Sequence, residues 1–517
     1  MFLRFRLSQG ISCDNISRLL YCLIAKDRKG IRMSVTEKQD RVRKIVFFCT
    51  ALLFIVFFIG ETDLRRREIP MDQLLKNAAV FVLLILLIPF AARHIARRER
   101  IRALLSRSET RNLLILLVLA VIPRIIWGLA VPPRIDSDYG LYVRMGQYYA
   151  GNGRPEMDNY LLTVAPNAVS YSVLTGLVMR LFGTTAMTLV VFAEILNISN
   201  VLLVYGVGRQ LTSGPRAFTA AAVFALLPEN VFYSNIPGIE AAAMFTVLAG
   251  LLLILAGRHR KPAACVLCCG AGGAVLAFSA CIRPNAYVIL AAALIYLLRE
   301  KEPEQPVRRK SLRLLALLAG AALVLCGHQV LKADLFAEER PVSGLGWSLY
   351  EGLDLESGGK WTEEKSKRCI EVIDACSPEE ADAVFRKEAL ERFGGYTFTE
   401  KLLMFLRKGG SLWYESRYSI FSLEGTGAWD GWRRLADFSW TACLAALIAV
   451  LLYSRRKPGG GAAGLMLTVI LVTTAWHMAG TSIGRYHYML IPFVLLLTAM
   501  LLPGKEKKPV PERSTDK

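Results

Sequence analysis

The sequence predicts an all-α, polytopic membrane protein with about twelve transmembrane helices, and two observations support this. The 517 residues are 54% hydrophobic with a mean hydropathy of +0.38, although 21% of them are charged. The apolar residues come in separate runs of about 17–22, the length that a helix needs to cross about 30 Å of hydrocarbon. Clusters of Arg and Lys separate these runs, as loops do between membrane spans.

Twelve segments have the length and composition of a span, and an even number places both chain ends on the same side of the membrane. The predicted spans are 44–60, 76–95, 112–131, 186–208, 216–233, 238–257, 262–281, 285–298, 311–331, 438–454, 461–480 and 487–503. We take 44–503 as one transmembrane domain that includes its external loops. The segment 1–43 is expected to be cytoplasmic, with a true start at Met33 as one option, and 504–517 to be a cytoplasmic tail.

The loop charges assign the two sides, because cytoplasmic loops carry an excess of Lys and Arg. With twelve spans, every basic cluster but one falls on the side of the chain ends, which is therefore cytoplasmic. The exception is Arg65–Arg67, in the first external loop. The clusters on the cytoplasmic side are Arg41–Lys44, Arg93–Arg102, Arg258–Lys261, Arg308–Arg313, Arg455–Lys457 and Lys505–Lys508.

Two long segments, 132–185 and 332–437, remain on the external side. Between Lys332 and Arg434 there are 15 Lys or Arg and 19 Asp or Glu, so the net charge of +20 belongs to the rest of the chain. This distribution is explained by membrane topology and anionic lipid, and it excludes nucleic acid as the expected partner. Segment 168–182 is too short to span and carries Arg180, so we expect an external helix in the membrane interface, and another at 139–150.

Two carboxylates stand at the external mouth of the third span, in the sequence Asp136-Ser137-Asp138. Either Asp136 or Ser137 could cap the helix that follows. A cap needs only one such residue, so the second Asp leaves a catalytic role open. A carboxylate at this position could accept a proton from a hydroxyl group, which is general-base catalysis.

From about Arg111 to Leu502 the chain resembles the bacterial C-type (GT-C) glycosyltransferases, relatives of the protein O-mannosyltransferases and the lipid A aminoarabinose transferases. The resemblance rests on the order of several short motifs, and it leaves the first two spans as an addition to the common core. The motifs are Asp138 with Tyr142 four positions later, Leu174–Gly183, Leu227–Ser234, Glu240, Arg283-Pro284, Gly344–Trp361, and Gly484–Tyr488 with Pro492.

This resemblance implies a GT-C fold and an enzyme of the bacterial cell membrane with an extracytoplasmic active site. Such an enzyme transfers a sugar from a polyprenyl-phosphate donor to an external acceptor in the cell envelope, and direct displacement inverts the anomeric centre. Asp138 would be the general base, with Asp136 as the second acidic residue. The donor phosphate and substrate would be bound by Arg485, Arg283, Tyr142, Tyr486 and Glu240.

Simpler interpretations of these residues stay open. Arg485 could lie among lipid headgroups, Arg283 could only end a hairpin beside Pro284, and Glu240 could complement a helix dipole. A divalent metal is also open, because some members of the family use one and others do not; we assign no metal ligand, although the sequence offers His328, His477 and His487.

Two other functions compete with the glycosyltransferase. A flippase or transporter of lipid-linked sugars typically has internal repeats and charged residues near the middle of the membrane, and neither is evident here. A ligase or polymerase of the O-antigen type would depend more on external Arg and His than on an Asp after an early span. The sequence indicates neither the sugar nor the acceptor.

Overall fold

The fold was analysed in a computed structural model that describes residues 35–66, 70–96, 108–151, 159–258, 260–299, 307–335, 341–454 and 461–502. Most of the described residues lie in helices, and none of them lies in a strand. The predicted all-α membrane fold is therefore confirmed. The expectations about residues 1–32 with Met33, and about the tail 504–517, lie outside these ranges.

Among the described residues, nine helical segments are long and apolar enough to cross a membrane, and each coincides with a predicted span. They are α2 (Val35–Arg65), α5 (Glu109–Ala130), α9 (Ala186–Leu211), α12 (Ile239–Gly257), α13 (Pro262–Ile282), α15 (Val307–Leu335), α20 (Trp429–Tyr453), α21 (Ala462–Ala479) and the pair η3 (Gly484–Leu490) and α22 (Ile491–Leu501).

The other three predicted spans also fall on helices. Span 216–233 is a broken helix, in which α10 (Gly214–Leu226) meets α11 (Pro228–Phe232) and η1 (Tyr233–Asn235) at a bend of 55°. Span 76–95 lies within α3 (Met71–Ala96), and span 285–298 is α14 (Ala286–Arg299), which has only 14 residues. The count of twelve stays a prediction.

The bend between α10 and α11 is stabilised by side-chain amides. Pro228 has no backbone N–H to continue the helix, and it begins α11. Asn230 donates to the carbonyl of Phe224 at 2.7 Å, and Asn235 donates to the carbonyl of Val131 at 2.8 Å. The Asn230 bond satisfies a backbone carbonyl that an unbroken helix would pair internally, as required away from water, and the Asn235 bond ties η1 to the end of α5.

The segment after α5 contains helices at the two predicted positions, α6 (Ser137–Ala150) and α8 (Pro166–Phe182). They pack face to face at two glycines. A Cβ on Gly146 would lie 2.7 Å from the hydroxyl of Thr175, and a Cβ on Gly176 would overlap Tyr149. Because α6 carries Asp138 and Tyr142, this close packing positions two of the predicted site residues.

Gly176→Ala is therefore expected to separate α6 from α8. An added methyl at a tight backbone contact typically costs about 1–3 kcal/mol, so the variant should unfold at a lower temperature in detergent and lose activity. Thermal unfolding followed by tryptophan fluorescence would measure the change. Gly394→Ala is the matched control, because a Cβ there meets nothing within 4 Å. Equal melting temperatures for the two variants would contradict the packing argument.

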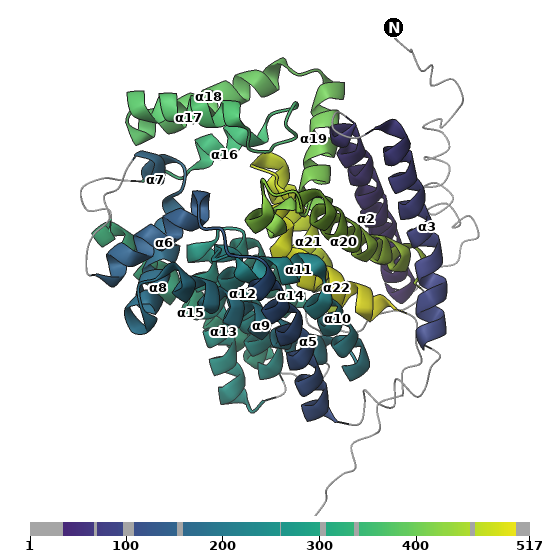
Figure 1. Ribbon diagram of the computed structural model, residues 1–517. Coiled ribbons are helices and arrows are strands. Elements are labelled where there is room, and N and C mark those ends of the chain that lie inside the picture. Colours follow the sequence, from purple (N-terminus) through teal and green to yellow (C-terminus); the bar gives the residue numbers. More distant parts are fainter. Residues whose placement is uncertain are drawn as a thin grey trace, which may run out of the picture.

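The long segment between α15 and α20, which is predicted to be external, folds into a helical cap at one end of the bundle (Figure 1). It contains α16 (Leu345–Gly352), α17 (Glu363–Ala375) and α18 (Pro378–Gly395), which share an aromatic core of Trp347, Tyr350 and Phe385, and α7 (Asn159–Thr163) packs against α17 and α18. The helix predicted at 377–393 is confirmed, with Ser377 and Glu380 forming a capping box at its start.

The next helix, α19 (Phe398–Trp413), is longer than the stretch 396–408 that the sequence suggests. It continues through Gly409 and Gly410, where a side chain would collide with Phe57 and Glu61 of α2. The two glycines are poor helix formers, but they allow α2 to approach closely, and tertiary packing outweighs their low propensity.

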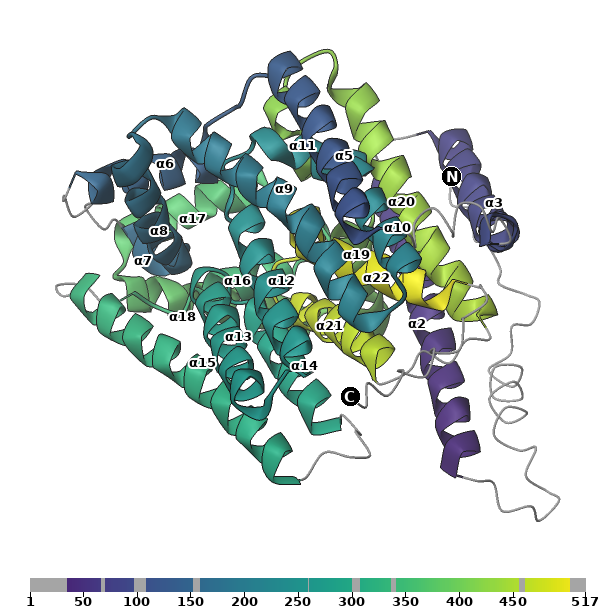
Figure 2. The same ribbon diagram turned by 90° about the horizontal axis from the view of Figure 1, so that it is seen from below.

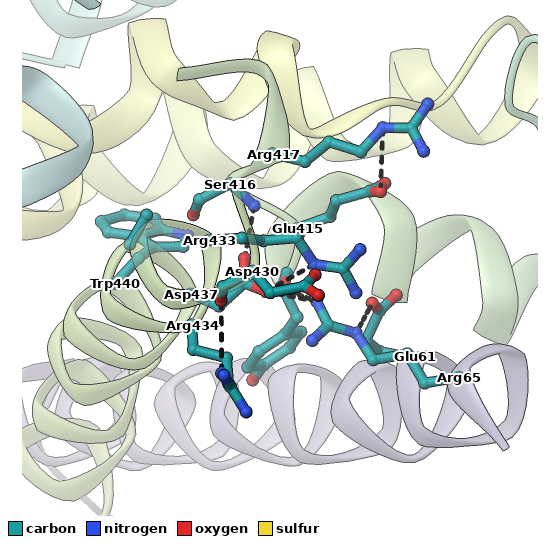
Figure 3. A network of polar contacts seen from close by, with 12 residues as sticks. Glu61, Arg65, Glu415, Ser416, Arg417, Asp430, Arg433, Arg434, Asp437 and Trp440 are labelled. Carbon is teal, nitrogen blue, oxygen red and sulfur yellow. Dashed lines mark hydrogen bonds and ion pairs between the residues drawn. The ribbon is translucent and has the colours of Figure 1, made fainter. Parts of the chain in front are cut away.

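The helices α2 and α3 lie on the side of the bundle opposite α6 and α8 (Figure 2). Arg65, at the end of α2, donates to Glu61 and also to Asp437 of α20 at 2.9 Å (Figure 3). Arg66 pairs with Asp63 at 3.1 Å. Acidic partners within 4 Å thus compensate the charges of Arg65 and Arg66, whereas Arg67 lies outside the described residues.

Candidate active site

The site is built around Asp138, in the first turn of α6. The residue before it, Ser137, has a φ of 51°, in the left-handed region that non-glycine residues seldom adopt. Asp136 occupies the N-cap position but makes no capping hydrogen bond with its side chain. The capping explanation for the acidic pair is therefore not supported by the contacts of Asp136.

Asp138 belongs to an alternating chain of acidic and basic groups. Arg485 Nη1 donates to Asp138 Oδ2 at 2.8 Å, and Arg485 Nε lies 2.9 Å from Glu240 Oε1. The same Glu240 oxygen accepts from Arg283 Nη1 at 2.7 Å. Four parts of the sequence thus supply one cluster: α6, the first turn of α12, the end of α13, and η3.

The cluster holds two carboxylates and two guanidinium groups, so its charges balance. The exposed fraction of the side chain is 36% for Asp138 and 16% for Arg485. Glu240 and Arg283 are nearly buried, with 1% and 6%. The alternative in which Glu240 only complements the helix dipole is incomplete, because Glu240 lies in the first turn of α12 and also pairs with both arginines.

Two tyrosines flank this cluster. The guanidinium of Arg283 lies over the ring of Tyr486, 5.3 Å from its centroid. Tyr142 packs edge to face against Tyr171, whose hydroxyl donates to the carbonyl of Gly238. Burial, and after it the nearby negative charge of Asp138, raise the pKa of Tyr142, so its phenol stays protonated.

Asp136 lies apart from the other predicted site residues. Its carboxylate accepts from Arg134 Nε at 2.6 Å, and Arg134 also pairs with Glu424 at 3.3 Å. The structure therefore brings together six of the seven predicted residues. Asp136 and Asp138 point to different partners although they are two positions apart.

Sequence reasoning missed a further carboxyl group, Glu351 of α16. It is 6% exposed, and its Oε2 accepts from the hydroxyl of Thr481 at 2.9 Å. Burial, with a smaller contribution from the charge of Asp138, raises the pKa of Glu351 to about 7. The sequence signal for Glu351 is its position within Gly344–Trp361, a segment that resembles a loop of the GT-C enzymes but suggests no chemistry for this residue.

Close backbone contacts hold the segment from Gly480 to Gly484 against α16 and against the chain that follows α19. A Cβ on Gly352 would overlap the backbone of Gly480, and one on Gly484 would overlap the carbonyl of Glu415. These contacts fix the segment that carries Thr481 and Arg485. They also dock the external cap onto the transmembrane helices next to the site.

The neighbouring His487 is buried and held from both sides of its ring. Its Nε2 lies 2.8 Å from Glu229, its Nδ1 lies 2.6 Å from the carbonyl of Leu412, and the ring stacks on Trp440. Glu229 in turn accepts from Ser416, whose backbone N–H bonds Asp437. The network of Figure 3 thus extends from α2 to within two residues of Arg485.

All three histidines considered for a metal site have protein partners. His328 lies 2.8 Å from the hydroxyl of Ser170, and His477 contacts Asn285 and the carbonyl of Thr481. Within the part of the chain that the structure describes, no three His, Cys, Asp or Glu side chains are grouped to hold a metal ion.

This arrangement suits transfer chemistry at a membrane surface. A half-exposed carboxylate can accept a proton, and fixed guanidinium groups can stabilise a phosphate that gains negative charge. Residues 167–327 match the family model described as dolichyl-phosphate-mannose-protein mannosyltransferase. Over this segment, about a third of its length, the chain is similar to that family of mannosyltransferases. The matched segment contains Glu240 and Arg283, whereas Asp138 and Arg485 lie on either side of it.

A solved structure shows a weaker likeness. The apo crystal structure of the Archaeoglobus fulgidus oligosaccharyltransferase is 13% identical, with a TM-score of 0.38, over 75% of this chain and 50% of that one. The chain therefore spans about half the length of that protein. No curated protein matches the sequence.

Proposed function

We propose that this chain is a GT-C membrane glycosyltransferase, which moves a sugar from a polyprenyl-phosphate donor to a hydroxyl group of an extracytoplasmic acceptor in the cell envelope of a bacterium. The observation that carries the proposal is the Asp138–Arg485–Glu240–Arg283 cluster. It combines a candidate base with two candidate phosphate ligands at the ends of several membrane helices. The energy for transfer resides in the donor, so no nucleotide site is required.

The donor phosphate is proposed to bind at Arg485. In the ligand-free chain, the guanidinium of Arg485 is shared between Asp138 and Glu240. A phosphate group would replace Asp138 as one of its partners, while Glu240 and Arg283 hold the rest of the cluster in place. Tyr142 and Tyr486 would line the position of the sugar.

Displacement of Asp138 from Arg485 would free its carboxylate oxygen Oδ2 to accept a hydrogen bond from the acceptor hydroxyl. Asp138 would then accept the proton of the acceptor hydroxyl as its oxygen attacks the anomeric carbon. The bond from that carbon to the phosphate oxygen breaks on the opposite face, and its electron pair leaves with the polyprenyl phosphate. This single displacement inverts the anomeric centre.

The direct test is transfer by the purified chain in lipid nanodiscs. Polyprenyl-phosphate mannose with a tritiated sugar would be offered first, then other sugars, with a cell-envelope fraction as the source of acceptor. We expect label in the acceptor, inverted anomeric configuration by NMR, and one polyprenyl phosphate released per sugar. A flippase would release no sugar from the carrier, and activity only with polyprenyl-diphosphate donors would favour the ligase-type enzyme. Either result would overturn the proposal.

A further inference from the structure

Lys408 of α19 is fully buried and lies where α19, the cap and the end of α21 meet. Its Nζ donates to the carbonyl of Gly352 and to the carbonyl of Gly480, at 2.6 Å in each case. Gly352 ends α16 in the cap, and Gly480 directly follows α21. The last carbonyls of a helix have no partner within that helix, so one lysine satisfies the ends of two helices.

The geometry of the two glycines allows a single side chain to bind both carbonyls. A Cβ on Gly352 would overlap the backbone of Gly480, so the two main chains approach as closely as glycine permits. An ammonium has three N–H donors and a neutral amine has two, so both bonds of Lys408 form in either protonation state. The contact therefore depends on the presence of the amine and not on its charge.

Two further bonds tie the chain after Gly480 to α19. The hydroxyl of Ser482 donates to the main-chain carbonyl of Lys408 at 2.8 Å. The Nδ1 atom of His487 lies 2.6 Å from the carbonyl of Leu412. Arg485 lies between these two anchors in the sequence. The helix α19 thus holds the chain on both sides of Arg485.

The helix α19 is itself fixed from its other side by α2. Arg407, next to Lys408, pairs with Asp63 at 2.7 Å and donates to the carbonyl of Leu355 at 2.9 Å. Gly409 and Gly410 bring α19 against α2, as described above. With α19 fixed in this way, the bonds of Lys408 set the place of the segment that it binds.

We propose that Lys408 is a positioning residue for sugar transfer, which holds Arg485 in the cluster by fixing Gly480 against α16 and α19. This inference rests on the proposed function, in which Arg485 binds the donor phosphate. A displaced Arg485 would bind the donor more weakly and would stabilise the departing phosphate less. A purely structural role of Lys408 would only reduce the amount of folded enzyme.

Lys408→Met tests this role, because methionine has nearly the same length but no N–H donor. We expect kcat/KM for polyprenyl-phosphate mannose to fall about 10- to 100-fold, since a displacement of about 1 Å can cost as much as 100-fold. The KM for the donor should rise and kcat should fall, as for Arg485→Lys. Lys401→Met is the matched control on the same helix, where the lysine lies over the ring of Phe393, and it should keep wild-type kinetics.

Combination with Arg485→Lys separates positioning from stability. If Lys408 acts through Arg485, Lys408→Met should lower kcat/KM by less than about threefold in the Arg485→Lys background, because the effects of coupled residues are not additive. Equal losses in the two backgrounds would overturn the inference. A fall in kcat at unchanged donor KM would also overturn it, because that result indicates only a smaller folded fraction. So would wild-type kinetics in Lys408→Met.

Hydrogen exchange tests the anchor without a transfer assay. Loss of the two hydrogen bonds should speed the exchange of backbone amides in residues 480–486 about tenfold in Lys408→Met, while the amides of α3 exchange as in wild type. Unchanged exchange in residues 480–486 would overturn the inference even for an active enzyme. If the wild-type protein transfers no sugar, the proposed function fails, and the exchange rates still decide whether Lys408 holds this segment.

Discussion

Asp138→Asn is expected to lower kcat for sugar transfer about 100- to 10,000-fold, the usual effect of removing a general base. The amide cannot accept the proton of the acceptor, but it occupies the same volume and can still accept the hydrogen bond from Arg485. Membrane insertion and folding should therefore be unchanged. The KM for the donor should change little, because the phosphate is assigned to the arginines.

Asp136→Asn is the matched comparison for the Asp138→Asn variant. Asp136→Asn makes the same chemical change two residues away, but Asp136 bonds Arg134 and not Arg485. We expect it to lower kcat less than tenfold. Initial rates with both variants in nanodiscs, at equal protein concentration, would decide between the two carboxylates. Full activity in Asp138→Asn would eliminate it as the base.

Arg485→Lys is expected to produce the second-largest loss, about 100- to 1,000-fold in kcat/KM. Lysine keeps the positive charge but is a single donor centre, whereas the Arg485 guanidinium reaches Asp138 and Glu240 with different nitrogens. The variant should bind the donor more weakly and stabilise the departing phosphate less. Both KM and kcat should therefore change.

The same substitution at Arg434 is the control, since this exposed side chain bonds the carbonyl of Asp430, a neighbour on its own helix, and lies apart from the cluster. Titration of each variant with a non-reactive polyprenyl phosphate would measure the binding contribution separately from the chemistry. An Arg485→Lys variant with wild-type kinetics would show that Arg485 only organises the helix ends.

Much of the site could be predicted from the sequence because its residues stand at the ends of apolar runs. Asp138, Glu240, Arg283 and Arg485 each lie beside a predicted span, and the loop charges assigned all four to one side. The structure unites them in one cluster. The pairing of Asp136 with Arg134 instead of Arg485 could not be predicted. The backbone turns at Ser137, which has a positive φ that the sequence pattern does not reveal.

Glu351 escaped prediction for a different reason. It is one of 19 acidic residues between Lys332 and Arg434, a segment in which an isolated carboxylate is normally a solvated surface charge. Its burial depends on the backbone contact between Gly352 and Gly480, which joins segments 128 positions apart. Likewise, the extension of α19 through Gly409 and Gly410 depends on α2, which no local propensity encodes.

The ion pair between Arg65 and Asp437 bears on how the chain can be shortened for experimental work. The resemblance to GT-C enzymes leaves the first two spans outside the common core, which would make them candidates for removal. Their removal would, however, take away Arg65, the closer of the two arginines that pair with Asp437, and would uncover Trp413, whose ring packs 4.9 Å from that of Phe54. A truncated protein would thus leave Asp437 with the longer pair to Arg433, at 3.9 Å, and would expose an indole ring, so the two helices should be kept.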